Sequence, residues 1–154
     1  MLWQHRRSGT NSIMTRDKFK LIHSELIMQV QCIESDLKLI YAGMHSGDFE
    51  ENLDMLEKAN LGTVIKKLKD LDYSDGHPDL SKQDYALLEQ IREIRNYWCH
   101  QCFLDYVYIQ DDYQRERKFQ QVAQRLSDDE NRTWDLHEHL EKLRNKMLRR
   151  YNRI

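Results

Sequence analysis

Apolar residues recur every three or four positions along most of the chain, which is the spacing of one face of an α-helix. The first run predicts a helix that begins after Thr15, a suitable N-cap, and ends within residues 43–47. Its apolar positions are Phe19, Ile22, Leu26, Val30, Ile33, Leu37 and Ile40. A second run over 53–71 has a break near residues 60–62, and residues 75–78 (Asp-Gly-His-Pro) predict a turn.

Two capping patterns divide the rest of the chain. Ser81-Lys82-Gln83-Asp84 predicts the start of a helix over about 82–110, and Ser127-Asp128-Asp129-Glu130 predicts the start of a last helix. A shorter helix between them carries Phe119, Val122 and Leu126, and the last one carries Leu136, Leu140, Leu143 and Met147. No segment alternates apolar and polar residues as a strand would. We therefore expect an all-α fold, a single bundle of about five helices over 15–154, after a flexible arm over 1–14.

The composition is that of a water-soluble globular domain. Of the 154 residues, 40% are hydrophobic and 32% are charged, so the chain can bury a core and is not expected to be disordered. No run of about 18 apolar residues is present, so we expect no membrane span. The basic N-terminus lacks the apolar stretch of a secretory signal, and three cysteines argue against a disulfide framework. These features predict a cytoplasmic protein.

Basic residues gather at both ends of a chain whose net charge is only −2. The segment 142–154 has six basic residues and no acidic one, and a second cluster comprises Arg6, Arg7, Arg16, Lys18 and Lys20. Such clusters can bind RNA phosphates with release of counterions. The candidate RNA-binding residues are Arg92, Lys142, Lys146, Arg149 and Arg150. An equally good interpretation of the C-terminal cluster is that it complements a helix dipole and keeps the surface soluble.

The helix predicted over 82–110 has two distinct faces. Its core stripe consists of Leu87, Leu88, Ile91, Ile94, Trp98, Cys102 and Ile109. His100 lies roughly opposite that stripe, Asn96 shares its face, and Phe103 and Val107 lie near it. Because this second face mixes polar and apolar residues, we expect it to pack against another helix or another subunit.

The residue types on this second face suit cleavage of RNA without a metal. Histidine titrates near neutrality and can take the 2′-hydroxyl proton, and arginine offers a planar set of donors for phosphate. Asn96 could orient the imidazole or bind a phosphate oxygen. Arg95 and His100 are about 140° apart around an ideal helix, so one chain pairs them poorly. A two-fold dimer could bring Arg95 of one chain near His100 of the other.

Arg95, Asn96 and His100 together resemble the Arg-x4–6-His signature of the HEPN superfamily, and Leu61-Gly62-Thr63-Val64-Ile65 resembles a segment that several HEPN families share. The resemblance implies a homodimeric helical bundle in which arginine and histidine meet in an interfacial cleft. It implies a metal-independent endoribonuclease of a toxin–antitoxin, phage-defence or RNA-processing system, with an antitoxin or other protein as a possible partner. Arg95 and His100 would be catalytic and Asn96 supporting. Cys102 stands where the toxin families paired with nucleotidyltransferases carry a tyrosine.

The main alternative is a non-catalytic helical module that binds RNA, a nucleotide or a partner protein. Arg95 and His100 would then form a polar interface or pair with acids such as Glu93. Cys99 and Cys102 could share a metal ion with His77 or His100, but no second ligand pair is evident, so we expect no metal and no cofactor. The tyrosines Tyr106, Tyr108 and Tyr113 could stack on bases, but core and interface packing is the commoner use of such residues. The histidines His137 and His139 are expected on a solvated face of the last helix.

Overall fold

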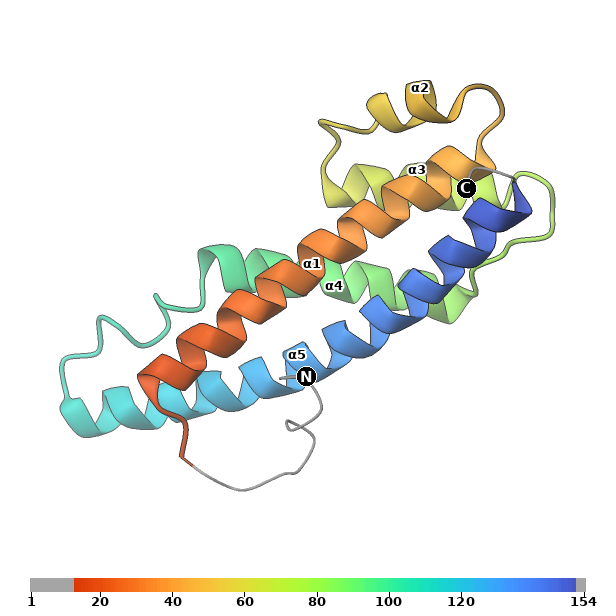
Figure 1. The fold of residues 1–154 in the computed structure, drawn as a ribbon. Helices are drawn as coiled ribbons and strands as arrows, with labels where there is room; N and C mark the ends of the chain where they lie inside the picture. The colour runs from red at the N-terminus through yellow and green to blue at the C-terminus, as the bar shows by residue number, and fades with distance from the viewer. Residues whose placement is uncertain (1–12, 152–154) are drawn as a thin grey trace.

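Five helices run through residues 13–151, the part of the chain that the computed structural model describes (Figure 1). They are α1 (Arg16–Met44), α2 (Phe49–Asp54), α3 (Leu61–Asp72), α4 (Lys82–His100) and α5 (Asp112–Arg150). This part contains no strand, so the predicted all-α bundle of about five helices is confirmed. None of the described helices is both long enough and apolar enough to cross a bilayer. Most of the predicted arm, with Arg6 and Arg7, lies outside the described residues, as does Arg153.

Two predicted helix starts, at Thr15 and at Ser81, are confirmed, because short polar side chains cap them. Thr15 Oγ1 accepts a hydrogen bond from the Lys18 amide at 3.2 Å. The predicted capping box of α4 is complete: Ser81 Oγ accepts from the Asp84 amide (3.0 Å) and Asp84 Oδ2 accepts from the Ser81 amide (2.9 Å). All seven apolar positions predicted for the first helix are buried in α1.

Two predicted helix boundaries are wrong. The helix expected over 82–110 ends at His100, and residues 101–108 form a series of turns. The break expected at Ser127 does not occur, because α5 continues from Asp112 to Arg150. Its polar residues pack inward instead of capping a helix: Asp129 binds the Trp98 indole, and Thr133 donates to the Asp129 carbonyl.

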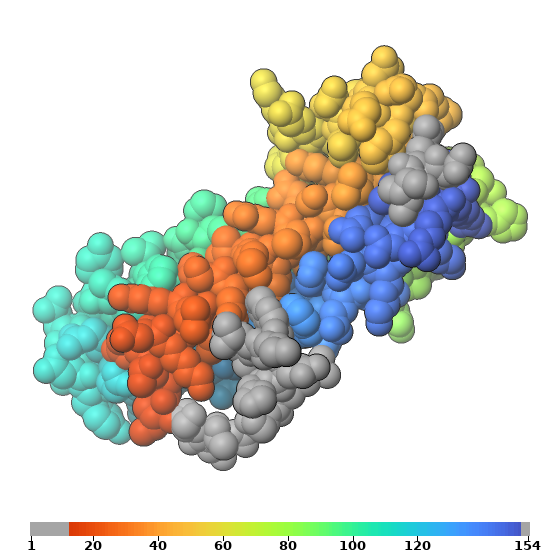
Figure 2. Space-filling model, viewed as in Figure 1, coloured from red at the N-terminus to blue at the C-terminus, as the bar shows by residue number. Residues whose placement is uncertain are grey.

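Helices α1 and α5 run parallel, with α4 antiparallel to both (Figure 1). The start of α1 lies against the start of α5, where the Phe19 and Phe119 ring centroids are 5.1 Å apart, and Gly43 lies beside Leu148 at the far end. Figure 2 shows α1 and α5 side by side on one face of the molecule, with α2 covering the end of α1. The core lies between these two helices, α3 and α4.

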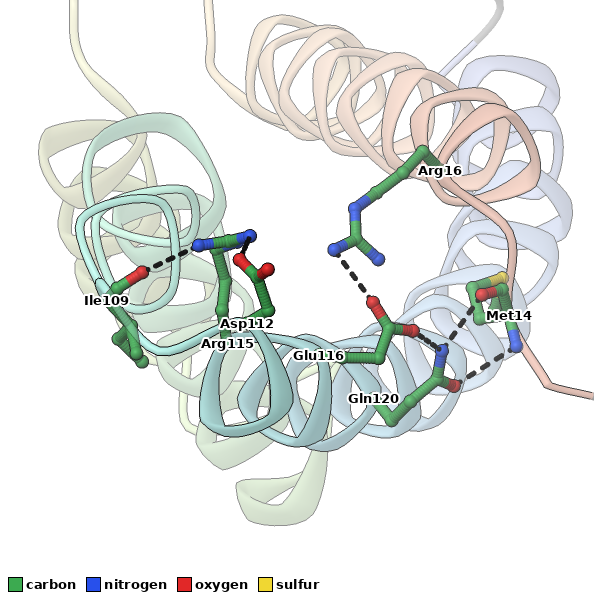
Figure 3. A network of polar contacts seen from close by, with 7 residues as sticks. All are labelled: Met14, Arg16, Ile109, Asp112, Arg115, Glu116 and Gln120. Carbon is green, nitrogen blue, oxygen red and sulfur yellow. Dashed lines mark hydrogen bonds and ion pairs between the residues drawn. The ribbon is translucent and has the colours of Figure 1, made fainter.

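Polar contacts join the residues before α1 to the first turns of α5 (Figure 3). Gln120 pairs with both backbone groups of Met14: its Oε1 accepts from the amide (3.1 Å) and its Nε2 donates to the carbonyl (2.9 Å). Arg16 Nη2 lies 2.9 Å from Glu116 Oε2, and the Arg16 guanidinium stacks over the Phe119 ring at 3.4 Å. These contacts align the two helices at their N-terminal ends.

Further along, five polar side chains lie in the contact between α1 and α5, and we call them the α1–α5 polar seam. Gln29 Nε2 donates to Glu130 Oε1 at 3.1 Å, and Arg144 Nη1 donates to Asp36 Oδ1 at 2.6 Å. His137 Nδ1 lies 3.9 Å from the other Asp36 oxygen. Burial raises the pKa of Asp36, an effect that its hydrogen bond to Arg144 opposes. A shift of α1 along α5 would leave these buried groups unpaired, so the seam sets the register of the two helices.

Replacing Arg144 with methionine should destabilise the fold by about 2–4 kcal/mol at pH 7, because it leaves the Asp36 carboxylate, whose side chain is 4% exposed, without its strongest partner. Chemical denaturation would measure the loss. The exposed Arg149→Met is the control and should stay within about 0.5 kcal/mol of wild type.

The same variant should show a pH dependence of definite sign. Because burial raises the pKa of Asp36, the folded protein prefers the neutral acid more than the unfolded chain does. Lowering the pH through that pKa should therefore shrink the difference between Arg144→Met and wild type. A difference that stays constant with pH would contradict this role for Asp36.

Candidate active site

The candidate residues lie on the second half of α4, whose buried face follows the predicted stripe. Leu88, Ile91, Ile94 and Trp98 are buried, and Cys102 is buried just beyond the helix end. The two outer members of the predicted stripe, Leu87 and Ile109, are only partly buried. The opposite face, which carries Asn96 and His100, is exposed in the single chain and is not packed against another described helix, so its expected packing against a second subunit stays a prediction. Phe103 and Val107 follow the end of α4, so the predicted helical placement of these two residues is wrong.

Asn96 and His100 make no side-chain hydrogen bond with another described residue, whereas Arg95 has a partner. The Arg95 side chain is 29% exposed, and its Nη1 lies 4.0 Å from Glu34 Oε2 on α1. This distance is at the outer limit of an ion pair, so the guanidinium keeps most of its donors. The pairing with Glu93 that the sequence allowed is not among the Arg95 contacts.

Arg95 and His100 are directed to different sides of α4. Arg95 lies on the side of α1, and Tyr97 lies on the side of α5, where the Arg125 guanidinium stacks over its ring at 3.5 Å. His100 is about 60° from Tyr97 but about 140° from Arg95 around the helix axis. One chain therefore does not bring the arginine and the histidine of the motif together.

The glycine upstream has a structural role beside this site. A Cβ on Gly62 would lie 3.1 Å from Arg92 Nε, so glycine lets the arginine lie against the start of α3. Arg92 Nη1 is also 3.4 Å from Glu89 on its own helix. Two sequence features, the Leu61-Gly62 segment and Arg92, are thus neighbours in space.

Trp98, in the last turn of α4, is hydrogen-bonded to both α1 and α5. The Trp98 indole donates to Asp129 Oδ2 on α5 at 2.8 Å, and the Trp98 carbonyl accepts from the His23 ring on α1 at 2.8 Å. Both contacts involve the residue two positions before His100. They restrict the motion of the turn that presents the histidine, which a catalytic group requires.

The carboxylate of Asp105, which follows α4, accepts hydrogen bonds from the end of the helix. Asp105 accepts from the Tyr97 hydroxyl at 2.6 Å through one oxygen and from Gln101 Nε2 at 2.9 Å through the other. The hydrogen bond from Tyr97, and then that from Gln101, hold the pKa of Asp105 below its ordinary value. Burial, followed by the bond to Asp105, raises the pKa of Tyr97, which keeps its proton as the donor. Asp105 therefore ties the chain after His100 back to α4.

The C-terminal basic residues form a separate group. Lys142, Lys146, Arg149 and Arg150, with Asn145, line one shallow surface depression on α5. Arg150 donates to Asp79 Oδ1 at 2.7 Å, and this bond raises the pKa of the guanidinium. Asp79 lies just before the start of α4, and His100 is its last residue, about 27 Å along the helix. The structure thus gathers four of the five candidate RNA-binding residues away from His100 and leaves only Arg92 near the motif.

The residues considered for metal binding do not converge. Cys99 is exposed, while Cys102 is buried with its thiol donating to the Trp98 carbonyl at 3.4 Å. Burial raises the pKa of the Cys102 thiol to about 11, so it is protonated near neutrality. In the described part of the chain, no three or more His, Cys, Asp and Glu side chains could together hold a metal ion.

Of the tyrosines and histidines for which the sequence predicted no chemical role, some are buried and others are exposed. Tyr106 is buried in the core, whereas Tyr108 and Tyr113 are exposed. His139 lies on the surface 3.4 Å from Asp84, but His137 turns into the α1–α5 polar seam, so the expected solvated position is wrong for His137.

Sequence reasoning missed Tyr97, Asp105, Arg125 and Asp129, which shape the surroundings of His100. Asp129 carried a detectable signal, because it falls on the buried spacing of α5 between Leu126 and Thr133. Contacts between helices, such as the stacking of Arg125 on the Tyr97 ring, produce no periodic pattern in the sequence.

No protein-family model, no curated protein and no solved structure matches this chain.

Asp105→Asn should lower the melting temperature at pH 7, because the neutral amide is a weaker acceptor for Tyr97 and Gln101. The pKa of Asp105 is lower in the folded than in the unfolded protein. Its stabilisation is therefore complete above the unfolded pKa and is lost as the pH falls through the folded one. Thermal melts from pH 7 to pH 2 should show the wild-type and variant curves converging at the acid end. The exposed Asp70→Asn serves as control, and an equal effect of both variants would rule out this role.

Proposed function

We propose that the protein is a metal-independent endoribonuclease that acts as a homodimer with a composite site at the subunit interface. His100 accepts the proton of an RNA 2′-hydroxyl as the 2′-oxygen bonds to phosphorus. It returns a proton to the 5′-oxygen as the P–O5′ bond breaks. Arg95 stabilises the charge that develops on the phosphate oxygens, and Asn96 orients the imidazole or a phosphate oxygen.

The observation that carries this proposal is the exposure of His100 and Asn96 on one face of a rigidly held helix turn. Neither side chain is engaged by another described residue, although the residues around them are closely bonded. An imidazole held on a fixed backbone but free at its ring nitrogens is suited to proton transfer.

The orientation of Arg95 supports a composite site. Within one chain its guanidinium lies toward Glu34 and α1, on another side of α4 from His100. A second copy packed against the exposed face of α4 could present its own Arg95 to His100. The weak 4.0 Å contact with Glu34 leaves the guanidinium donors available for a phosphate in that arrangement.

The second candidate is a non-catalytic module that binds RNA. It is favoured by the basic cluster of Lys142, Lys146, Arg149 and Arg150, which lies far from His100 and could bind phosphates without it. The two candidates differ in one measurable respect, which is whether His100 is needed.

Purified protein should cleave single-stranded RNA in the presence of EDTA, and His100→Ala should reduce the rate by at least about a hundredfold. Labelled RNA on a denaturing gel would measure the cleavage, with His139→Ala, another exposed histidine, as the control. If expression is toxic to cells, His100→Ala should relieve the toxicity. Absence of cleavage, or cleavage that survives His100→Ala, would overturn the proposed role of His100. RNA binding without any cleavage would favour the binding module.

The composite site can be tested by mixing two inactive variants, Arg95→Ala and His100→Ala. In a mixed dimer one site has both wild-type residues and the other has neither. After subunit exchange, about half of the dimers should be mixed, so activity should recover to about a quarter of wild type. If both residues act within one chain, mixing should restore nothing.

A further inference from the structure

A polar groove runs between the outer part of α4 and the middle of α5, with a volume of about 460 Å³. Gln90 and Glu93 line it from α4, and Gln121, Gln124, Arg125 and Arg132 line it from α5. The carboxylate of Asp129 forms part of its wall. That side chain is 6% exposed and is shared by the Trp98 indole and the two arginines.

The Arg125 guanidinium stacks on the Tyr97 ring at the end of the groove nearest the C-terminus of α4. Its Cζ lies 3.5 Å from the centre of the Tyr97 ring, and its Nε lies 3.6 Å from Asp129 Oδ2. The side chain is still 51% exposed, and its two Nη groups make no hydrogen bond with another described residue. A stacked guanidinium of this kind loses little conformational freedom when it binds an anion through its remaining donors.

The groove opens on the same side of α4 as His100. Glu93 lies about 20° from His100 around the helix axis. Tyr97, on which Arg125 stacks, lies about 60° from His100. Arg95 is about 140° away on the side of α1. Within a single chain, Arg125 is therefore better placed than the arginine of the motif to act beside His100.

The charges in the groove limit what it can bind. The charge of Asp129 is balanced by its ion pairs with Arg125 and Arg132, but Glu93 and Asp128 are acidic, so a row of phosphates along the whole groove would be repelled. The groove therefore favours a single phosphate, bound through the two Nη groups of Arg125, over a row of phosphates. The three glutamine amides offer donors and acceptors that match the edges of nucleobases.

We propose that Arg125 binds a phosphate of the RNA strand next to the one attacked at His100, and that the α4–α5 groove holds the adjoining nucleotide. This inference rests on the proposed ribonuclease function and adds a phosphate-binding residue from outside the Arg95–His100 motif. Because the phosphate is a neighbour of the reacting one, Arg125 contributes to binding of the strand, and proton transfer remains with His100.

The test uses a short fluorescein-labelled single-stranded RNA with 2′-O-methyl riboses, which cannot be cleaved through the 2′-oxygen. Fluorescence anisotropy should show that Arg125→Gln weakens binding about tenfold, as expected for one charge-assisted contact. The slope of log affinity against log salt should fall by about 0.7. Arg117→Gln is the matched control, because it removes an exposed arginine of α5 that is not among the groove residues, about two turns before Arg125, and should change affinity less than twofold.

Arg125→Lys keeps the charge but loses the flat stacking and should recover part of the affinity. In wild-type protein, the NMR signal of the Trp98 indole N–H, which shares Asp129 with Arg125, should shift on titration with the same RNA. This second readout needs no substitution and so does not depend on the folding of a variant. Equal effects of Arg125→Gln and Arg117→Gln, or an unmoved Trp98 signal, would overturn the proposal.

Cleavage assays separate this inference from the function on which it rests. With a cleavable RNA, Arg125→Gln should raise KM and leave kcat nearly unchanged, whereas His100→Ala should lower kcat. Cleavage that needs His100 but has the same KM in Arg125→Gln would overturn the proposed RNA contact of the groove and support the ribonuclease function. RNA binding that needs Arg125, in a protein that cleaves no RNA, would support the RNA contact of the groove and overturn the ribonuclease function.

Discussion

The structure depends on the parallel alignment of α1 and α5, which the buried pairs Gln29–Glu130 and Asp36–Arg144 hold in one register. Apolar side chains alone would tolerate sliding of one helix along the other, because leucine and isoleucine contacts are similar from turn to turn. A buried carboxylate does not, since every other position of its partner leaves a charge without compensation. The contacts of Met14 and Arg16 with α5 secure the same alignment at the N-terminal end.

This alignment determines where the end of α4 can lie. Trp98 is bonded to His23 on α1 and to Asp129 on α5, so both helices must be in register for the two contacts to form together. The turn that carries His100 is consequently placed by residues distant in the sequence. Asp105 then folds the following segment back onto Tyr97, and the polar face of α4 is left open on the side of the α4–α5 groove.

Positive charge is distributed unevenly around this face. Arg95 is turned toward Glu34, Arg125 is stacked on Tyr97, and the cluster around Lys146 lies beyond the other end of α4. The wheel analysis correctly placed His100 and Asn96 on the face opposite the buried stripe, because that placement depends only on the helical repeat. It expected the face to be packed, whereas in the single chain both residues are exposed. It could not identify Arg125, because the Arg125–Tyr97 contact joins residues that are 28 positions apart on different helices.

The sequence by itself determined the all-α class, the start of α4 at its capping box and the buried face of each long helix, since all three follow from local hydrogen bonding and the periodicity of apolar residues. Only the tertiary structure decided that α4 ends at His100 and that α5 continues through Ser127. A polar run such as Ser127-Asp128-Asp129-Glu130 can cap a new helix or supply buried partners to neighbouring ones. The choice depends on whether Trp98 and Gln29 stand opposite, and no local pattern contains that information.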